Sequence, residues 1–125
     1  MVARRYNELV AWQLASQLRS EVNRLTQRSG FERNRWLQDQ LRSASHSACA
    51  NIAEGFSRFY PRDFARFVRM AKGSLEETKE HLEQATSIGL VSAEETRRLG
   101  DLADQACGAA VGLIRYLQTA RPPQQ

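Results

Sequence analysis

Apolar residues recur every three to four positions in four long stretches of the chain, and each stretch predicts one amphipathic helix. The predicted helices span residues 7–28, 32–59, 61–88 and 92–119. The breaks between them contain Ser29–Gly30, Tyr60–Pro61 and Gly89, which are residues that interrupt helices. Four amphipathic helices with short connections predict an all-α fold, an antiparallel up-down four-helix bundle.

Residues at the predicted helix ends fit the chemistry of helix capping. Asn7 is expected to cap the first helix, and Gly30 is expected to end it in the left-handed conformation. Pro61 fits the first position of the third helix, where a missing N–H has no cost. Ser92 and Glu95 have the spacing of a capping box at the start of the fourth helix.

Length and composition are those of one ordinary globular domain. The 125 residues are enough to bury a core, so we expect a single domain over residues 1–125, with a disordered tail at 120–125. No apolar run approaches the ~18 residues of a membrane span. The first seven residues lack the apolar segment of a secretory signal. We therefore expect a cytoplasmic protein that does not enter the membrane.

Candidate catalytic and metal-binding groups are sparse. Cys49 and Cys107 are expected to be buried thiols in a reducing cytosol, while a disulfide between adjacent helices stays open as the alternative. The two cysteines and two histidines occur singly, without metal-ligand spacing. Glu54 has no second carboxylate or histidine beside it in its motif. We predict no catalytic residue, no cofactor, no metal and no enzymatic activity.

The second predicted helix has an unusual run of small residues. Every residue between Ser43 and Ala50 except His46 is serine, alanine or cysteine. Small side chains allow the backbone of a neighbouring helix to approach closely. This stretch therefore predicts tight packing and carries no catalytic signature.

Four segments, found in the same order along the chain, resemble the 23S rRNA intervening-sequence proteins, a four-helix-bundle family also labelled S23. The segments are Val10–Gln13 (VAWQ), Gln40–Ala44 (QLRSA), Asn51–Gly55 (NIAEG), and the third-helix pieces Phe64–Phe67 (FARF) with Ala71–Glu77 (AKGSLEE). Family members usually carry proline two residues before the asparagine, where this chain has Cys49. We therefore expect its second helix to lack a proline kink.

The resemblance implies a homopentameric ring of four-helix bundles and no established biochemical activity. Some family members are encoded within 23S rRNA insertions. Distant relatives that accompany diversity-generating reverse transcriptases are basic pentamers that bind nucleic acid and the polymerase. The resemblance therefore implies self-association and favours nucleic acid as a partner.

Beside the core stripe of the second helix lies a stripe of mixed polarity. It consists of Trp36, Gln40, Ser47, Asn51, Glu54 and Arg58. Such a stripe is either solvated or part of a buried or interfacial hydrogen-bond network. Because Gln40, Asn51, Glu54 and the adjacent Gly55 belong to the motifs above, we favour the network.

Two further pairs of residues are candidates for a subunit contact. Leu9 and Trp12 lie off the core arc of the first helix, so they pack at the end of the bundle or against another subunit. Gly108 and Gly112 lie one turn apart, about opposite the core arc of the fourth helix. They either admit a neighbouring helix or are chance small residues in an alanine-rich segment.

The chain is basic, with a net charge of +4, and 16 of its 18 basic residues are arginines. Arginine suits phosphate because its planar guanidinium donates two hydrogen bonds at once. GC-rich codon usage is an alternative explanation of the same bias. The charge permits nucleic-acid binding without requiring it.

Charge is divided along the third predicted helix. Arg62, Arg66, Arg69 and Lys72 lie in its first half, and Glu76, Glu77, Glu80 and Glu83 lie in its second. This order opposes the helix dipole, although pairs such as Lys72 with Glu76 would offset part of the cost. Arg58, Arg62, Arg66 and Arg69 are therefore candidates for phosphate binding. Pairing between subunits and a solvated face are the alternatives.

Two functional hypotheses follow from these patterns. The first is a homo-oligomer that binds RNA or DNA non-specifically through its arginines. The second is a protein-interaction scaffold that does not bind nucleic acid. Phe64 and Phe67 are expected to point into the core, so no aromatic residue is expected beside the arginines and sequence preference should be slight.

Overall fold

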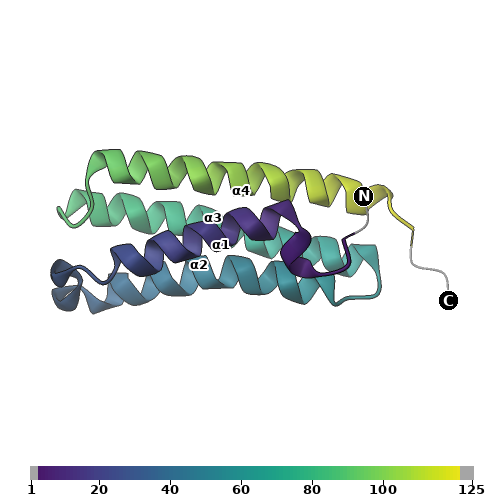
Figure 1. Ribbon diagram of the computed structural model, residues 1–125, viewed down its shortest axis with the longest axis horizontal. Helices are drawn as coiled ribbons and strands as arrows, with labels where there is room; N and C mark the ends of the chain where they lie inside the picture. The colour runs from purple at the N-terminus through teal and green to yellow at the C-terminus, as the bar shows by residue number, and fades with distance from the viewer. Residues whose placement is uncertain (1–2, 122–125) are drawn as a thin grey trace.

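Residues 3–121, which the computed structural model describes, form four α-helices and two short 3₁₀ helices. The elements are η1 (Tyr6–Glu8), α1 (Val10–Leu25), η2 (Ser29–Arg33), α2 (Arg35–Phe56), α3 (Pro61–Ser87) and α4 (Ala93–Thr119). Consecutive α-helices run in opposite directions, as Figure 1 shows. The predicted all-α four-helix bundle is confirmed. Most of the tail expected at 120–125 lies outside the described residues.

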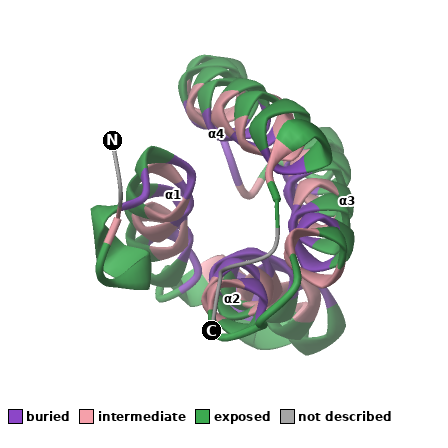
Figure 2. Cartoon of the chain, turned by 90° about the vertical axis from the view of Figure 1, so that its right-hand side faces the viewer, coloured by how far each residue is buried: buried purple, intermediate pink, exposed green. Residues whose placement is uncertain are grey.

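The apolar stripes of the four helices face one another and form the core. Each helix packs against the next one in the chain, and α1 also packs against α4, which closes the bundle. Buried positions face the inside in the end-on view of Figure 2. Fully buried leucines such as Leu18, Leu41 and Leu75 come from three different helices, and each contributes roughly 1.5–3 kcal/mol on burial.

The most extensive contact between helices joins α2 to α3. Gly55 is buried at this seam, and a Cβ atom added to it would lie 2.8 Å from the Cβ of Phe67 and 3.1 Å from the carbonyl oxygen of Phe64. Farther along the seam, Ser74 Oγ of α3 donates a hydrogen bond to Ser47 Oγ of α2 at 3.0 Å. Small residues on α2 therefore do bring the two backbones close together.

The start of α1 differs from the prediction. Leu9 has an extended backbone (φ −74°, ψ 129°), so α1 begins at Val10 and the expected cap, Asn7, lies in η1 instead. The extended residue turns the Leu9 side chain into the core. Leu9 therefore packs at the end of the bundle, which was one of the two expected outcomes.

The end of α1 also differs, because α2 completes it. Thr26 is fully buried beyond the last residue of α1, and its hydroxyl donates to the Val22 carbonyl at 2.8 Å. From α2, Gln38 Nε2 donates to the Thr26 carbonyl at 2.7 Å and Arg42 Nε donates to the Thr26 hydroxyl at 2.8 Å. These long-range contacts satisfy the groups that a local glycine cap was expected to satisfy.

Gly30 does not form the expected left-handed cap. It lies in η2, and Gly89 is the glycine with positive φ (82°) among residues 3–121. A Cβ on Gly30 would lie 2.4 Å from Leu90 Cδ2, so this glycine instead makes room for the loop between α3 and α4.

The second helix is shorter than predicted at both ends, while the start of α3 and both ends of the α3–α4 loop agree with prediction. The second helix was predicted to reach residue 59, but α2 ends at Phe56 and the Phe59 side chain is 45% exposed in the link to α3. Pro61 occupies the first turn of α3, and Gly89 closes its end. Ser92 and Glu95 form the capping box of α4.

The α2–α3 seam gives the first testable prediction. Gly55→Ala should lower the free energy of unfolding by about 1–3 kcal/mol, because the new methyl group must displace Phe64 or Phe67. Gly73→Ala is the matched control in α3, since its Cβ would meet nothing within 4 Å and alanine raises helix propensity by up to ~1 kcal/mol. Urea unfolding measures the free energy of unfolding of both variants. Equal stability of the two variants would contradict the close approach at Gly55.

Candidate nucleic-acid interface

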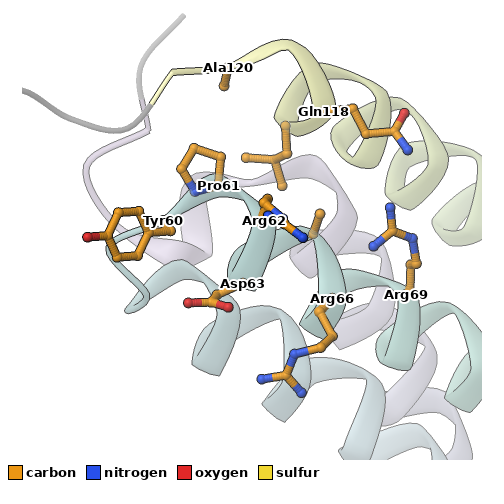
Figure 3. Close-up of a pocket in the computed structure, with 10 residues that line it drawn as sticks. Tyr60, Pro61, Arg62, Asp63, Arg66, Arg69, Gln118 and Ala120 are labelled. Carbon is orange, nitrogen blue, oxygen red and sulfur yellow. The ribbon is translucent and has the colours of Figure 1, made fainter.

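A groove of about 880 Å³ lies between the first turns of α3 and the last turns of α4 (Figure 3). Its lining residues are Tyr60, Pro61, Arg62, Asp63, Ala65, Arg66, Arg69, Leu117, Gln118 and Ala120. We refer to this feature as the arginine groove. Three of the four predicted phosphate-binding arginines line it.

Arg62, Arg66 and Arg69 are all exposed along the first half of α3. None of them lies within 4.0 Å of a carboxylate in the part of the chain that the structure describes, and Asp63 in the same groove reaches no cation either. The groove therefore combines three cationic side chains with one anionic side chain.

Three arginines on the opposite half of the bundle, Arg24, Arg28 and Arg98, are paired with carboxylates instead. Glu21 contacts Arg24 at 2.6 Å and Arg98 at 2.7 Å. Arg28 contacts Glu95, and this pair, together with the backbone N–H of Ser92, lowers the pKa of Glu95 to about 2. The Arg98–Glu21 pair joins α4 to α1, whereas the arginines of the groove have no carboxylate within 4.0 Å among the described residues.

Arg58, the fourth predicted arginine, lies beside the groove in the link between α2 and α3. Its guanidinium contacts Glu54 at 3.1 Å and lies 4.6 Å from the centre of the Phe67 ring. The Arg66 guanidinium lies 4.7 Å from the same ring. Phe67 is buried as predicted, and its ring contacts one arginine from the α2–α3 link and one from α3. Arg58 therefore adjoins the groove, with part of its charge neutralised.

Tyr60 is a groove residue that the sequence analysis missed. It is 53% exposed and lies at one end of the groove in Figure 3, with Arg69 at the other. The expectation that no aromatic residue accompanies the arginines is therefore wrong. Tyr60 directly precedes Pro61 in the predicted break between two helices, and its proximity in sequence to Arg62 is the one signal of its location.

The mixed stripe on α2 divides into two parts. Asn51 Nδ2 donates to the Ser47 carbonyl at 3.0 Å and to Ser47 Oγ at 3.1 Å, and Ser47 in turn accepts from Ser74 of α3. Glu54 is exposed and contacts Arg58. The network thus includes Asn51 and excludes Glu54 within a single chain. Trp36, at the start of the stripe, is 66% exposed, and Gln40 is half-buried.

Trp12 and the two glycines of α4 have different surroundings. Trp12 is partly buried against the core, with the Tyr6 ring 5.2 Å away at 76° and the Arg19 guanidinium 5.9 Å from its centre. It packs at the end of the bundle. Gly108 and Gly112 are exposed, and a Cβ on either would meet nothing within 4 Å in this chain.

Charges in the second half of α3 pair differently from the prediction. Lys72 does not contact Glu76 within 4.0 Å among the described residues, and Glu76 instead accepts a hydrogen bond from Cys107 Sγ at 3.3 Å. Burial and this carboxylate raise the pKa of the Cys107 thiol to about 12. Cys49 and Cys107 are both buried and free, as favoured from the sequence.

A second, apolar groove of about 500 Å³ adjoins the first and shares Pro61, Leu117 and Ala120 with it. It forms where the last turns of α4 extend beyond the start of α1 (Figure 1). Its aromatic lining is Phe56, Phe59, Phe64 and Tyr116, with Arg58 and Arg121 also present.

Comparison with known proteins identifies the family. The model of the family described as "23S rRNA-intervening sequence protein" matches residues 7–110. This chain belongs to that family. The resemblance found in the four sequence segments is therefore confirmed.

A solved structure supports the fold. A crystal structure of a protein of unknown function from the S23 ribosomal protein family of Bacteroides thetaiotaomicron superposes with a TM-score of 0.75. The two sequences are 16% identical, and the match covers 85% of this chain and 99% of the other. No curated protein matches the chain. Within residues 3–121, none of the helices has the length and apolar character needed to cross a membrane.

The divided stripe on α2 leads to a second prediction. Ser47→Ala should lower the free energy of unfolding by ~0.5–1.5 kcal/mol, because Asn51 and Ser74 each lose a partly buried partner. Glu54→Ala should change the stability of the isolated chain by less than about 1 kcal/mol, because its pairing with Arg58 is exposed. Thermal unfolding at low protein concentration tests both. A larger loss of stability for Glu54→Ala would indicate that the Glu54 carboxylate lies in an interface between subunits.

Proposed function

We propose that this member of the family is a homo-oligomeric protein that binds nucleic acid through phosphate groups in the arginine groove and that has no catalytic activity. The observation that carries the proposal is the group of three exposed arginines without a carboxylate partner among the described residues. A guanidinium donates two parallel hydrogen bonds to a phosphate, which makes arginine the best-suited side chain for this contact.

The groove holds these arginines in a defined arrangement. Arg62, Arg66 and Arg69 extend from one continuous helix, and at ~1.5 Å rise per residue Arg62 and Arg69 start about 10 Å apart along its axis. The Phe67 ring supports Arg66, and Arg58 of the α2–α3 link lies against the same ring. The backbone of a polynucleotide lying along α3 would therefore meet several guanidiniums in succession.

Self-association would strengthen this binding. One groove offers few charges, so a single chain would bind a polyanion weakly, whereas several grooves in one assembly bind with much greater avidity. The exposed glycines on α4 support an oligomer, because each costs the helix ~1 kcal/mol relative to alanine without serving the packing of this chain. A homopentamer is the form that the family resemblance implies.

The alternative is a protein-interaction scaffold. The apolar groove beside the arginine groove favours it, because its exposed aromatic residues, Phe59 and Tyr116, would suit an apolar protein segment. Such a scaffold would show no salt-dependent affinity for nucleic acid.

The third prediction tests phosphate binding directly. The parent should bind RNA and DNA with an affinity that falls linearly with salt on a log–log plot. Replacing Arg62, Arg66 and Arg69 together with glutamine should weaken binding and reduce the slope by about 2 for a single strand in one groove, since each phosphate contact contributes ~0.7. Fluorescence anisotropy at several salt concentrations gives both quantities.

The matched control replaces Arg33, Arg35 and Arg97 with glutamine. These three exposed arginines lie outside the groove, near the opposite end of the bundle (Figure 1), and their loss changes the net charge equally. The control should keep most of the affinity. Equal losses in the two triple variants would show that only net charge matters, and no binding by the parent would favour the scaffold.

The fourth prediction concerns the assembly. Light scattering at micromolar concentration should give a mass several times the 14.2 kDa of one chain. Gly108→Leu with Gly112→Leu should lower that mass while the helices stay folded, because the new side chains fit an isolated chain but would block a close helix contact. A monomeric parent would refute the oligomer, and an unchanged mass in the variant would locate the contact elsewhere.

A further inference from the structure

Tyr60 gives the arginine groove a flat aromatic surface next to its charges. The ring is 53% exposed, and Tyr60 lines the same groove as Arg62, Arg66 and Arg69 (Figure 3). The tyrosine side chain adds no charge to the groove. An aromatic face beside guanidiniums is the arrangement by which proteins hold bases and phosphates of a single strand together.

The position of Tyr60 is restrained before any ligand binds. Its backbone is extended (φ −94°, ψ 134°) at the start of α3, and the following Pro61 disfavours a helical conformation for it. Its ring meets the Phe59 ring edge to face, with centres 4.9 Å apart and planes at 83°. A base that stacks here would therefore meet a surface that is already positioned.

The rest of the groove suits unpaired nucleotides. Pro61, Ala65 and Leu117 give it an apolar lining, while Asp63 and Gln118 provide polar groups beside the arginines. In a duplex the faces of the bases are stacked on one another and only the phosphates are accessible to such a groove. In a single strand both the phosphates and the base faces are accessible.

We infer that the arginine groove prefers single-stranded nucleic acid and that Tyr60 stacks on a base while the arginines bind the neighbouring phosphates. This inference rests on the proposed function and specifies its ligand. Stacking on one aromatic ring should strengthen binding about tenfold. Because every base has an aromatic face, this preference requires no particular sequence.

The test compares two single strands with equal numbers of phosphates, an oligothymidylate and an abasic strand, by fluorescence anisotropy at low salt. The parent should bind the oligothymidylate about tenfold more tightly than the abasic strand. Tyr60→Leu should remove this difference in affinity without weakening the binding of the abasic strand. Tyr60→Phe, which keeps the ring, should preserve it.

The control variant is Trp36→Leu, which removes an aromatic residue near the start of α2 that is even more exposed than Tyr60. It should keep the preference for the strand with bases. Equal affinity of the parent for both strands would overturn the stacking inference while leaving phosphate binding in place. If neither strand showed salt-dependent binding to the parent, the proposed function itself would be refuted.

Discussion

The close approach of α2 and α3 is the constraint on which the rest of the structure depends. Gly55 lets the two backbones meet where Phe64 and Phe67 of α3 pack against α2. Phe67 then lies under two guanidiniums, that of Arg58 from the α2–α3 link and that of Arg66 from α3. The arrangement of positive charge beside the groove is therefore a consequence of backbone packing, and a glycine in the core determines where arginines sit on the surface.

Some arginines of this small bundle are neutralised by carboxylates, and others are not. At the end where α1 meets α4, Glu21 and Glu95 neutralise Arg24, Arg28 and Arg98 and join the two helices. Along the first half of α3 the arginines have no such partners among the described residues, against the preference of the helix dipole. Surface pairs stabilise little, so the unpaired arginines cost the fold little and remain available to bind a polyanion.

Sequence patterns predicted the elements of this fold well because the signals were local. Pro61, Gly89 and the Ser92–Glu95 box act through their own backbone neighbourhood, and the structure has them where the spacing required. The predicted boundaries of α1 were wrong because the observed ones depend on tertiary contacts. Buried Thr26 takes its partners from Gln38 and Arg42, residues of another helix that no local pattern connects to it.

The candidate site was predictable only in part. The spacing of Arg62, Arg66 and Arg69 placed them on one face of a helix, and they line one groove. The other wall of that groove comes from Leu117 and Gln118, far away in the sequence, so its existence could not be predicted. Tyr60 was missed for a related reason, since an aromatic residue in a helix break can point in many directions until packing against Phe59 selects one.

Arginine-specific modification by phenylglyoxal, with and without a bound single strand, tests whether nucleic acid occupies the arginine groove. Mass spectrometry of the modified peptides measures how far each arginine is protected. We expect the strand to protect Arg62, Arg66 and Arg69, while exposed Arg33, Arg35 and Arg97 react as they do in the free protein. Protection of the second group, or equal protection of both, would contradict the assignment of nucleic-acid binding to this groove.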